Sequence, residues 1–184
     1  IYQALTQIGG TLQRVIGPVL FKAEAAYRDF EQPSRSQRAM LPPSPLFNLT
    51  DRDHTLIAIG LEYNLYHQTG ESALLIEGQY AIWGEGKESG EGSLLLFDKD
   101  LLLGWRYAFN DVADRSLTTS VIIDMETPEQ LFFNAVYAQR IGDMWRGELG
   151  LRLISYPPKD PDNPQGPEYI DQAHYAYTSL IRYF

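Results

Sequence analysis

The sequence contains three histidines, and one of them could form a nucleophilic pair. His174 precedes Ser179 by five residues. A serine activated by histidine is the reactive pair of many esterases and acyl transferases, provided that both side chains meet at one point. Residues five apart in an extended strand point to opposite faces, so the spacing argues against a simple dyad. His67 stands in a short turn and is interpreted as a solvated residue. We expect no catalytic residues.

Acidic residues gather in stretches that lack a regular pattern. They are Asp51, Asp53, Asp98, Asp100 and the carboxylates of 160–171. Such oxygens suit Ca²⁺ and could bridge to lipopolysaccharide through divalent ions. Their spacing does not match an EF-hand loop, so we interpret them as solvated loop residues. We predict no metal site and no cofactor.

Charges of both signs occupy alternate positions in segments that are otherwise apolar. Opposite charges on neighbouring strands can pair across a sheet face, and charged ladders line the lumens of membrane β-barrels. The alternatives are the solvated face of a soluble sheet and a purely structural network of charges. We predict that these residues line a lumen: Lys22, Glu24, Glu62, Glu77, Arg106, Asp124, Arg140, Arg146, Glu148 and Arg152.

The elements that must position these charges are β-strands. Apolar and polar residues alternate with period two in segments of about ten residues, and helical periodicity is hard to find. The pattern predicts strands at 6–16, 19–30, 55–66, 73–83, 101–110, 117–125, 131–140 and 145–156, and a closing strand within 174–184. Proline is confined to the connections, as a hydrogen-bonded sheet requires. We predict an all-β, antiparallel transmembrane β-barrel, with residues 1–184 as one domain or the C-terminal part of one.

The connections alternate in length. Short ones at 17–18, 67–72, 110–114 and 141–143 alternate with long ones at 31–53, 84–98 and 157–172, and 126–130 is the exception. Outer-membrane barrels have short periplasmic turns and long extracellular loops. Single-chain bacterial barrels also have an even strand number and begin in the periplasm. Because about nine strands are visible, we expect at least one more strand upstream of Ile1.

Aromatic residues fall near the predicted strand ends. In a membrane barrel, aromatic girdles stand at the two interfaces. The candidates for these girdles are Tyr27, Trp83, Trp105, Phe109, Trp145 and Tyr183. The chain also closes on the aromatic stretch HYAYTSLIRYF, whereas the ends of soluble domains usually fray. A terminal Phe184 is typical of outer-membrane barrels, where it is an insertion signal.

Composition excludes several classes of function. The formal net charge of −9 argues against nucleic-acid binding. The absence of cysteine excludes thiol catalysis, cysteine-based zinc sites and disulfides. No apolar run is long enough for a transmembrane helix, whereas a membrane strand needs only about 9–11 alternating residues.

Five stretches carry a family resemblance. The stretch DKDLLLGWRYAFND at 98–111 resembles a strand and turn of a family of uncharacterised proteobacterial outer-membrane barrel proteins. Four other stretches are similar to further parts of that family: LIEG at 75–78, which matches a strand with a central Glu, the hairpin at 140–149, the closing residues 179–184 and GPVLFKAEAAYR at 17–28. Gln139 and Arg182 depart from its pattern. The resemblance implies a barrel in the cell envelope and names no chemistry.

These features predict an integral protein of the cell outer membrane that gives passage to small or amphipathic solutes. Its expected partners are outer-membrane lipids, lipopolysaccharide, the barrel insertion machinery and other envelope proteins. The alternatives are a barrel-borne lipid-modifying enzyme of the deacylase or acyltransferase type, a closed scaffold barrel and a soluble β-sandwich.

One expectation is geometric. Arg106 lies between Trp105 and Tyr107, so it should project to the opposite face from these aromatic residues. We expect it to lie close to Glu77 or Asp124 on the neighbouring strands.

Overall fold

The structure is a computed structural model of the 184-residue chain. It describes residues 4–30, 53–84, 98–158, 168 and 170–183. The predicted insertion signal Phe184, Asp51 and most of the three long connections lie outside the described residues. Nothing in the described part is a helix long and apolar enough to span a bilayer.

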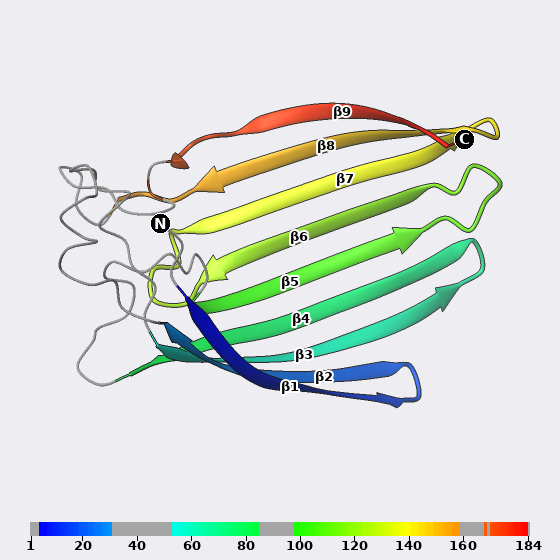
Figure 1. The fold of residues 1–184 in the computed structure, drawn as a ribbon. Coiled ribbons are helices and arrows are strands. Elements are labelled where there is room, and N and C mark those ends of the chain that lie inside the picture. Colours follow the sequence, from blue (N-terminus) through cyan, green and yellow to red (C-terminus); the bar gives the residue numbers. More distant parts are fainter. Residues whose placement is uncertain (1–3, 31–52, 85–97, 159–167, 169, 184) are drawn as a thin grey trace.

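The described residues form nine β-strands (Figure 1). The strands are β1 (Leu5–Ile16), β2 (Val19–Phe30), β3 (His54–His67), β4 (Gly70–Trp83), β5 (Lys99–Ala108), β6 (Ser116–Asp124), β7 (Leu131–Ile141), β8 (Trp145–Ser155) and β9 (Tyr175–Arg182). Each predicted strand is present, and the predicted bounds differ from these by three residues at most.

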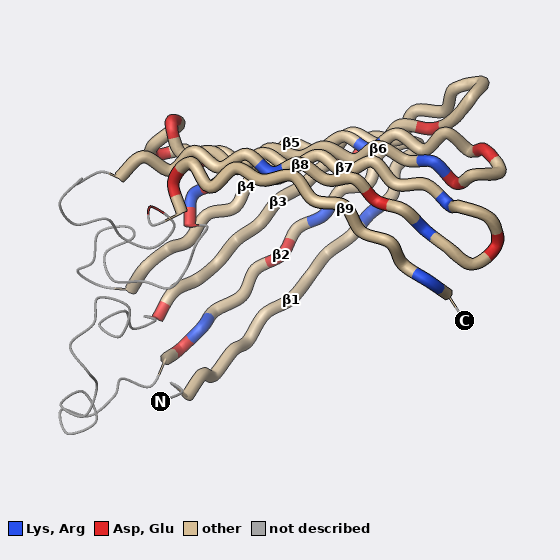
Figure 2. The backbone as a smooth tube through the Cα atoms, turned by 90° about the horizontal axis from the view of Figure 1, so that it is seen from above, with Lys and Arg blue, Asp and Glu red and all other residues tan. Residues whose placement is uncertain are grey.

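The strands make one antiparallel sheet in sequence order, from β1 to β9. Figure 2 shows that the sheet is curved and open, with β1 and β9 as its two edges. The prediction of an all-β antiparallel fold is therefore confirmed. Closure into a barrel is not a feature of the described sheet.

Strand register places one apolar row across seven strands. Phe21 on β2 opposes Leu61, which opposes Ile76, and the row continues through Leu103, Val121, Phe133 and Leu153. Directly opposed residues project from the same side of a sheet. We call this side the apolar face. Its side chains remain accessible, with 53% of Ile59 and 46% of Ile76 exposed.

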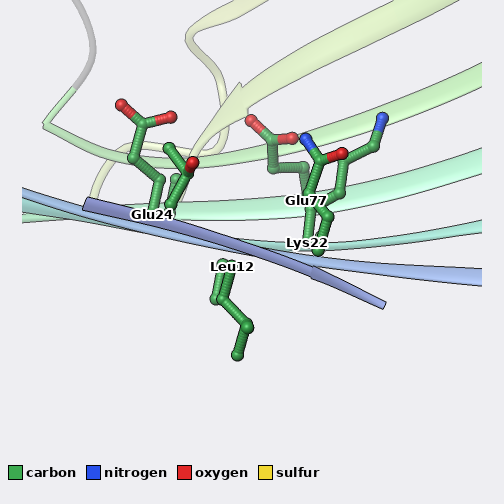
Figure 3. Close-up of a pocket in the computed structure, with 9 residues that line it drawn as sticks. Leu12, Lys22, Glu24 and Glu77 are labelled. Carbon is green, nitrogen blue, oxygen red and sulfur yellow. The ribbon is translucent and has the colours of Figure 1, made fainter. Parts of the chain in front are cut away.

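The other side, the polar face, carries every residue that was predicted to line a lumen. Register places all of these residues on one side: Lys22, Glu24, Glu62, Glu77, Arg106, Asp124, Arg140, Arg146, Glu148 and Arg152. Figure 3 shows Leu12 pointing away from Lys22, Glu24 and Glu77. Most of the buried strand residues, including Ala26, Ala81 and Ala138, also belong to the polar face.

Short turns hold one end of the sheet. Gly17 and Gly142 adopt φ values of +60° and +63°, which glycine tolerates without steric cost. In the β5–β6 turn, the Asp111 carboxylate accepts a hydrogen bond from the backbone N–H of Arg115 and pairs with its guanidinium. The hydrogen bond from Arg115 lowers the pKa of Asp111, and the same contact raises the pKa of Arg115.

Of the six aromatic residues that were predicted to form interfacial girdles, four lie on the apolar face and two on the polar face. Tyr27, Trp105, Phe109 and Trp145 follow the apolar face. Trp83 opposes His54 on the polar face, where the ring centroids are 5.0 Å apart. Tyr183 shares a pocket with Arg140 and Arg146 of the polar face. Both residues stand at strand ends, where the local aromatic pattern did not determine the face.

The pairing of β9 with β8 shows which face each residue of the last strand occupies. Arg182 opposes Trp145 on the apolar face, and its guanidinium lies 5.5 Å from the centre of the indole ring. A guanidinium over an aromatic face is stabilised by the ring quadrupole. Tyr175, Tyr177 and Ser179 therefore project from the polar face.

Gly150 provides a test of this packing. A Cβ at this position would overlap the ring of Tyr177, which also contacts Arg152. We expect Gly150→Ala to lower the free energy of unfolding by about 1–3 kcal/mol, as overpacking does. Urea unfolding of the purified protein measures the change. Gly78→Ala is the matched control, because a Cβ there meets nothing within 4 Å, and equal losses in both variants would contradict the packing.

Candidate functional site: the polar face

The first cluster of the polar face lies on β2, β3 and β4. Lys22 Nζ is 3.2 Å from Glu62 Oε2, and both side chains are partly exposed. Gly60 stands between Lys22 and Glu77 in the register. A Cβ on Gly60 would lie 3.1 Å from Glu77 Oε2, so the glutamate lies beside the position that glycine leaves open. With Glu24, the cluster contains three carboxylates and one ammonium. Lys22, Glu24 and Glu77 line a hollow of about 90 Å³ (Figure 3).

The second cluster stands at the turn end of β7 and β8. Arg146 pairs with Glu148 at 3.1 Å and with Asp114 at 3.6 Å. Arg140 opposes Arg146 directly, so two guanidiniums face each other across the strands. They line a pocket of about 250 Å³ together with Asp114, Asp143 and Tyr183. The two aspartates balance the two arginines in formal charge.

The third cluster surrounds Arg152. Its Nε donates to Asn134 Oδ1 at 3.2 Å, and its Nη1 donates to the Tyr175 hydroxyl at 2.6 Å. The guanidinium carbon lies 5.6 Å from the ring centre of Tyr175 and 5.7 Å from that of Tyr177. The tyrosines were missed in the sequence because the alternation of the last strand did not determine which face its aromatic residues occupy.

Arg106 lies on the expected face but not beside the expected partners. It opposes Ala73 and Thr118, whereas Glu77 opposes Leu102. Four residues along a strand span about 13 Å, so Glu77 is out of reach. Asp124 opposes Asp100, six residues from Arg106. The prediction of proximity was wrong because it treated strand midpoints as equal in depth.

Asp124 also has a local role. Its Oδ1 accepts hydrogen bonds from the backbone N–H groups of Glu126 and Thr127, at 2.7 Å and 2.8 Å. These bonds form the turn that joins β6 to β7. Asp124 therefore stands at the loop end of the polar face as a turn residue and opposes Asp100. Asp100 lies in β5 and is buried, so its interpretation as a solvated loop residue was wrong.

His174 and Ser179 do not meet. His174 Nδ1 accepts a hydrogen bond from the backbone N–H of Ile154 at 3.1 Å, and Ser179 opposes Glu148. Five extended residues separate the two side chains by about 17 Å. In the described part of the chain, no group of three His, Asp or Glu side chains is arranged to hold a metal ion.

A different histidine does contact a serine. His67 Nε2 lies 3.0 Å from Ser72 Oγ across the β3–β4 turn. Ser72 is 6% exposed, so its hydroxyl has little access to a substrate. The ring of Tyr107 stands 6.0 Å from the His67 ring. Among the described residues no carboxylate bonds to the other nitrogen of His67, so the third member of a triad is missing. The spacing of five residues across a tight hairpin was the signal that could have revealed this pair.

Comparisons with known proteins give no relative: no family model, curated protein or solved structure matches this chain. The resemblance to proteobacterial outer-membrane barrel proteins stays a prediction.

The His67–Ser72 contact is expected to be structural. Ser72→Ala removes a partly buried hydrogen bond and should lower the free energy of unfolding by about 1 kcal/mol, measured by urea unfolding. We also expect the intact protein to resist labelling by a fluorophosphonate, a reagent for activated serines. Labelling that disappears in Ser72→Ala would contradict this expectation.

Proposed function

We propose that this chain is part of an outer-membrane β-barrel whose polar face lines a passage for small or amphipathic solutes. The observation that carries the proposal is the exposed apolar row across β2–β8. In the described part, the strands pack against their sheet neighbours, and no second layer covers the apolar face. Leaving a large aliphatic side chain in water instead of burying it costs about 1.5–3 kcal/mol. Lipid would remove that cost along the whole row.

The polar face supports the passage. Its charges form ion pairs within the sheet, such as Lys22–Glu62 and Arg146–Glu148, and remain partly accessible. The strands of membrane barrels have one face toward water and the other toward hydrocarbon, and the polar and apolar faces of this sheet fit that arrangement. Further strands pairing with the edges of β1 and β9 would complete the barrel.

The proposal includes a location and partners. The chain would reside in the outer membrane, contact its lipids and lipopolysaccharide, and be inserted by the barrel insertion machinery. The end of the barrel that carries the short turns would face the periplasm. A closed scaffold barrel within an envelope complex would use the same two faces without conducting, so conductance separates it from a passage.

Neighbouring leucines on β5 test the membrane assignment. Leu103 belongs to the apolar row, whereas Leu102 opposes Glu77 on the polar face. We expect Leu103→Arg to destabilise the protein folded in lipid vesicles by about 2–4 kcal/mol, the cost of arginine at the bilayer midplane. Leu102→Arg, the control, should cost far less because Glu77 can pair with it. A soluble sheet would tolerate Leu103→Arg, so equal stability of the two variants would overturn the proposal.

Planar-bilayer recording of the full-length protein tests the passage. We expect ion conductance, and Glu24→Gln should shift the selectivity toward anions because it removes a negative charge from the lumen. The matched control is Asp29→Asn, on the same strand but on the other face, which should leave the selectivity unchanged. Absence of conductance in protein that is shown to be inserted would contradict a passage and favour a closed barrel.

A further inference from the structure

Arg152 differs from Lys22 and Arg146, two cations of the same face that pair with carboxylates, in what surrounds it. Lys22 and Arg146 contact carboxylates. The hydrogen-bond partners of Arg152 are the neutral oxygens of Asn134 and Tyr175, and none of the ion pairs formed by the described residues includes it. Its positive charge is therefore held in place without being neutralised.

The residues around Arg152 are also neutral. The register row that crosses it contains Gly104, Ser120, Asn134 and Tyr175, from β5 to β9. Glu148 is four residues away along β8 and is already paired with Arg146. An anion beside Arg152 would therefore meet hydroxyl and amide groups and no adjacent carboxylate.

The guanidinium is held in one orientation. Two hydrogen bonds, to Asn134 and Tyr175, hold two of its nitrogens, and the rings of Tyr175 and Tyr177 both lie near its centre. Gly150 leaves the space that the Tyr177 ring fills. An arginine that is fixed before binding loses less conformational entropy when it binds, and a guanidinium matches the planar oxygens of carboxylates and phosphates.

Unused donors remain for a ligand. A guanidinium has five N–H groups, and two are used by the partners above. Three remain among the described residues, enough for a two-pronged bond to an oxyanion. The side chain is partly exposed, so these groups are accessible from the polar face.

We propose that Arg152, oriented by Asn134, Tyr175 and Tyr177, is a binding site for the carboxylate or phosphate group of a solute on the polar face. The proposal rests on the proposed function and deepens it, since it assigns the passage a preference for solutes with an anionic head. The tyrosine rings add apolar surface for the organic part that adjoins that group.

The test measures the binding of three small aromatic probes to the full-length protein in detergent by isothermal titration calorimetry. Benzoate carries a carboxylate, phenyl phosphate carries a phosphate, and benzyl alcohol is neutral. We expect at least one anion to bind and the alcohol not to bind. The tighter anion identifies the preferred head group. Equal binding of all three probes would overturn the proposal.

Substitutions locate the site. Arg152→Gln should weaken anion binding at least about tenfold, the effect of losing a charge-assisted hydrogen bond. Arg146→Gln is the matched control, because it removes the same charge from the same strand and face but from a carboxylate-paired site, and it should leave binding unchanged. Unchanged binding in Arg152→Gln, or an equal loss in Arg146→Gln, would overturn the site.

Arg152 on β8 bonds to Tyr175 on β9, so its substitution could also weaken the pairing of these strands. Two further measurements separate such a loss of structure from a loss of binding. Arg152→Lys retains the charge without the planar fork and should weaken binding while circular dichroism shows a folded sheet. Wild-type affinity in this variant would overturn the recognition by a guanidinium. Bilayer conductance separates the two proposals: binding without conductance refutes the passage alone, and conductance with unchanged binding in Arg152→Gln refutes the site alone.

Discussion

The backbone hydrogen-bond ladder is the constraint on which the rest of the structure depends. Eight antiparallel pairings link the nine strands, and each pairing fixes which residues share a face. A slip of one residue in a single pairing would move every side chain beyond it to the other face. The ten charged residues that were predicted to line a lumen share one side because the six registers from β2 to β8 agree. The separation of an apolar from a polar face is thus a property of the whole ladder.

The strands and most faces could be predicted from the sequence because alternation is a local signal. The depth of a residue is not local, since it depends on how far each strand is displaced along its neighbour. Arg106 illustrates this: its face was predicted correctly, but its neighbours are Ala73 and Thr118. The faces of Trp83 and Tyr183 at strand ends, and of the tyrosines of β9, required the register. Arg152 was predicted for the polar face, but its partners could not be.

Glycines contribute to the arrangement of the polar face as much as charged residues do. Gly60 lies between Lys22 and Glu77, and Gly150 lies beneath Tyr177. In both places a glycine on the neighbouring strand leaves room for a larger side chain, Glu77 in one case and Tyr177 in the other. The same arrangement orients the groups. Glu77 lies beside Gly60, and Tyr177 over Gly150 stands within reach of Arg152.

The pairing of each strand with its neighbours in the chain has a consequence for assembly. The sheet contains no crossover, so every substantial contact between strands joins elements that are consecutive in sequence. The loop-closure entropy of each hairpin can then be offset by that hairpin's own hydrogen bonds before the next strand joins. Growth can proceed stepwise, with the last strand in place serving as the template for the following one. Such a sheet would lose its strands from the edges inward, and the energetic effect of a defect would be concentrated in the two pairings that flank it.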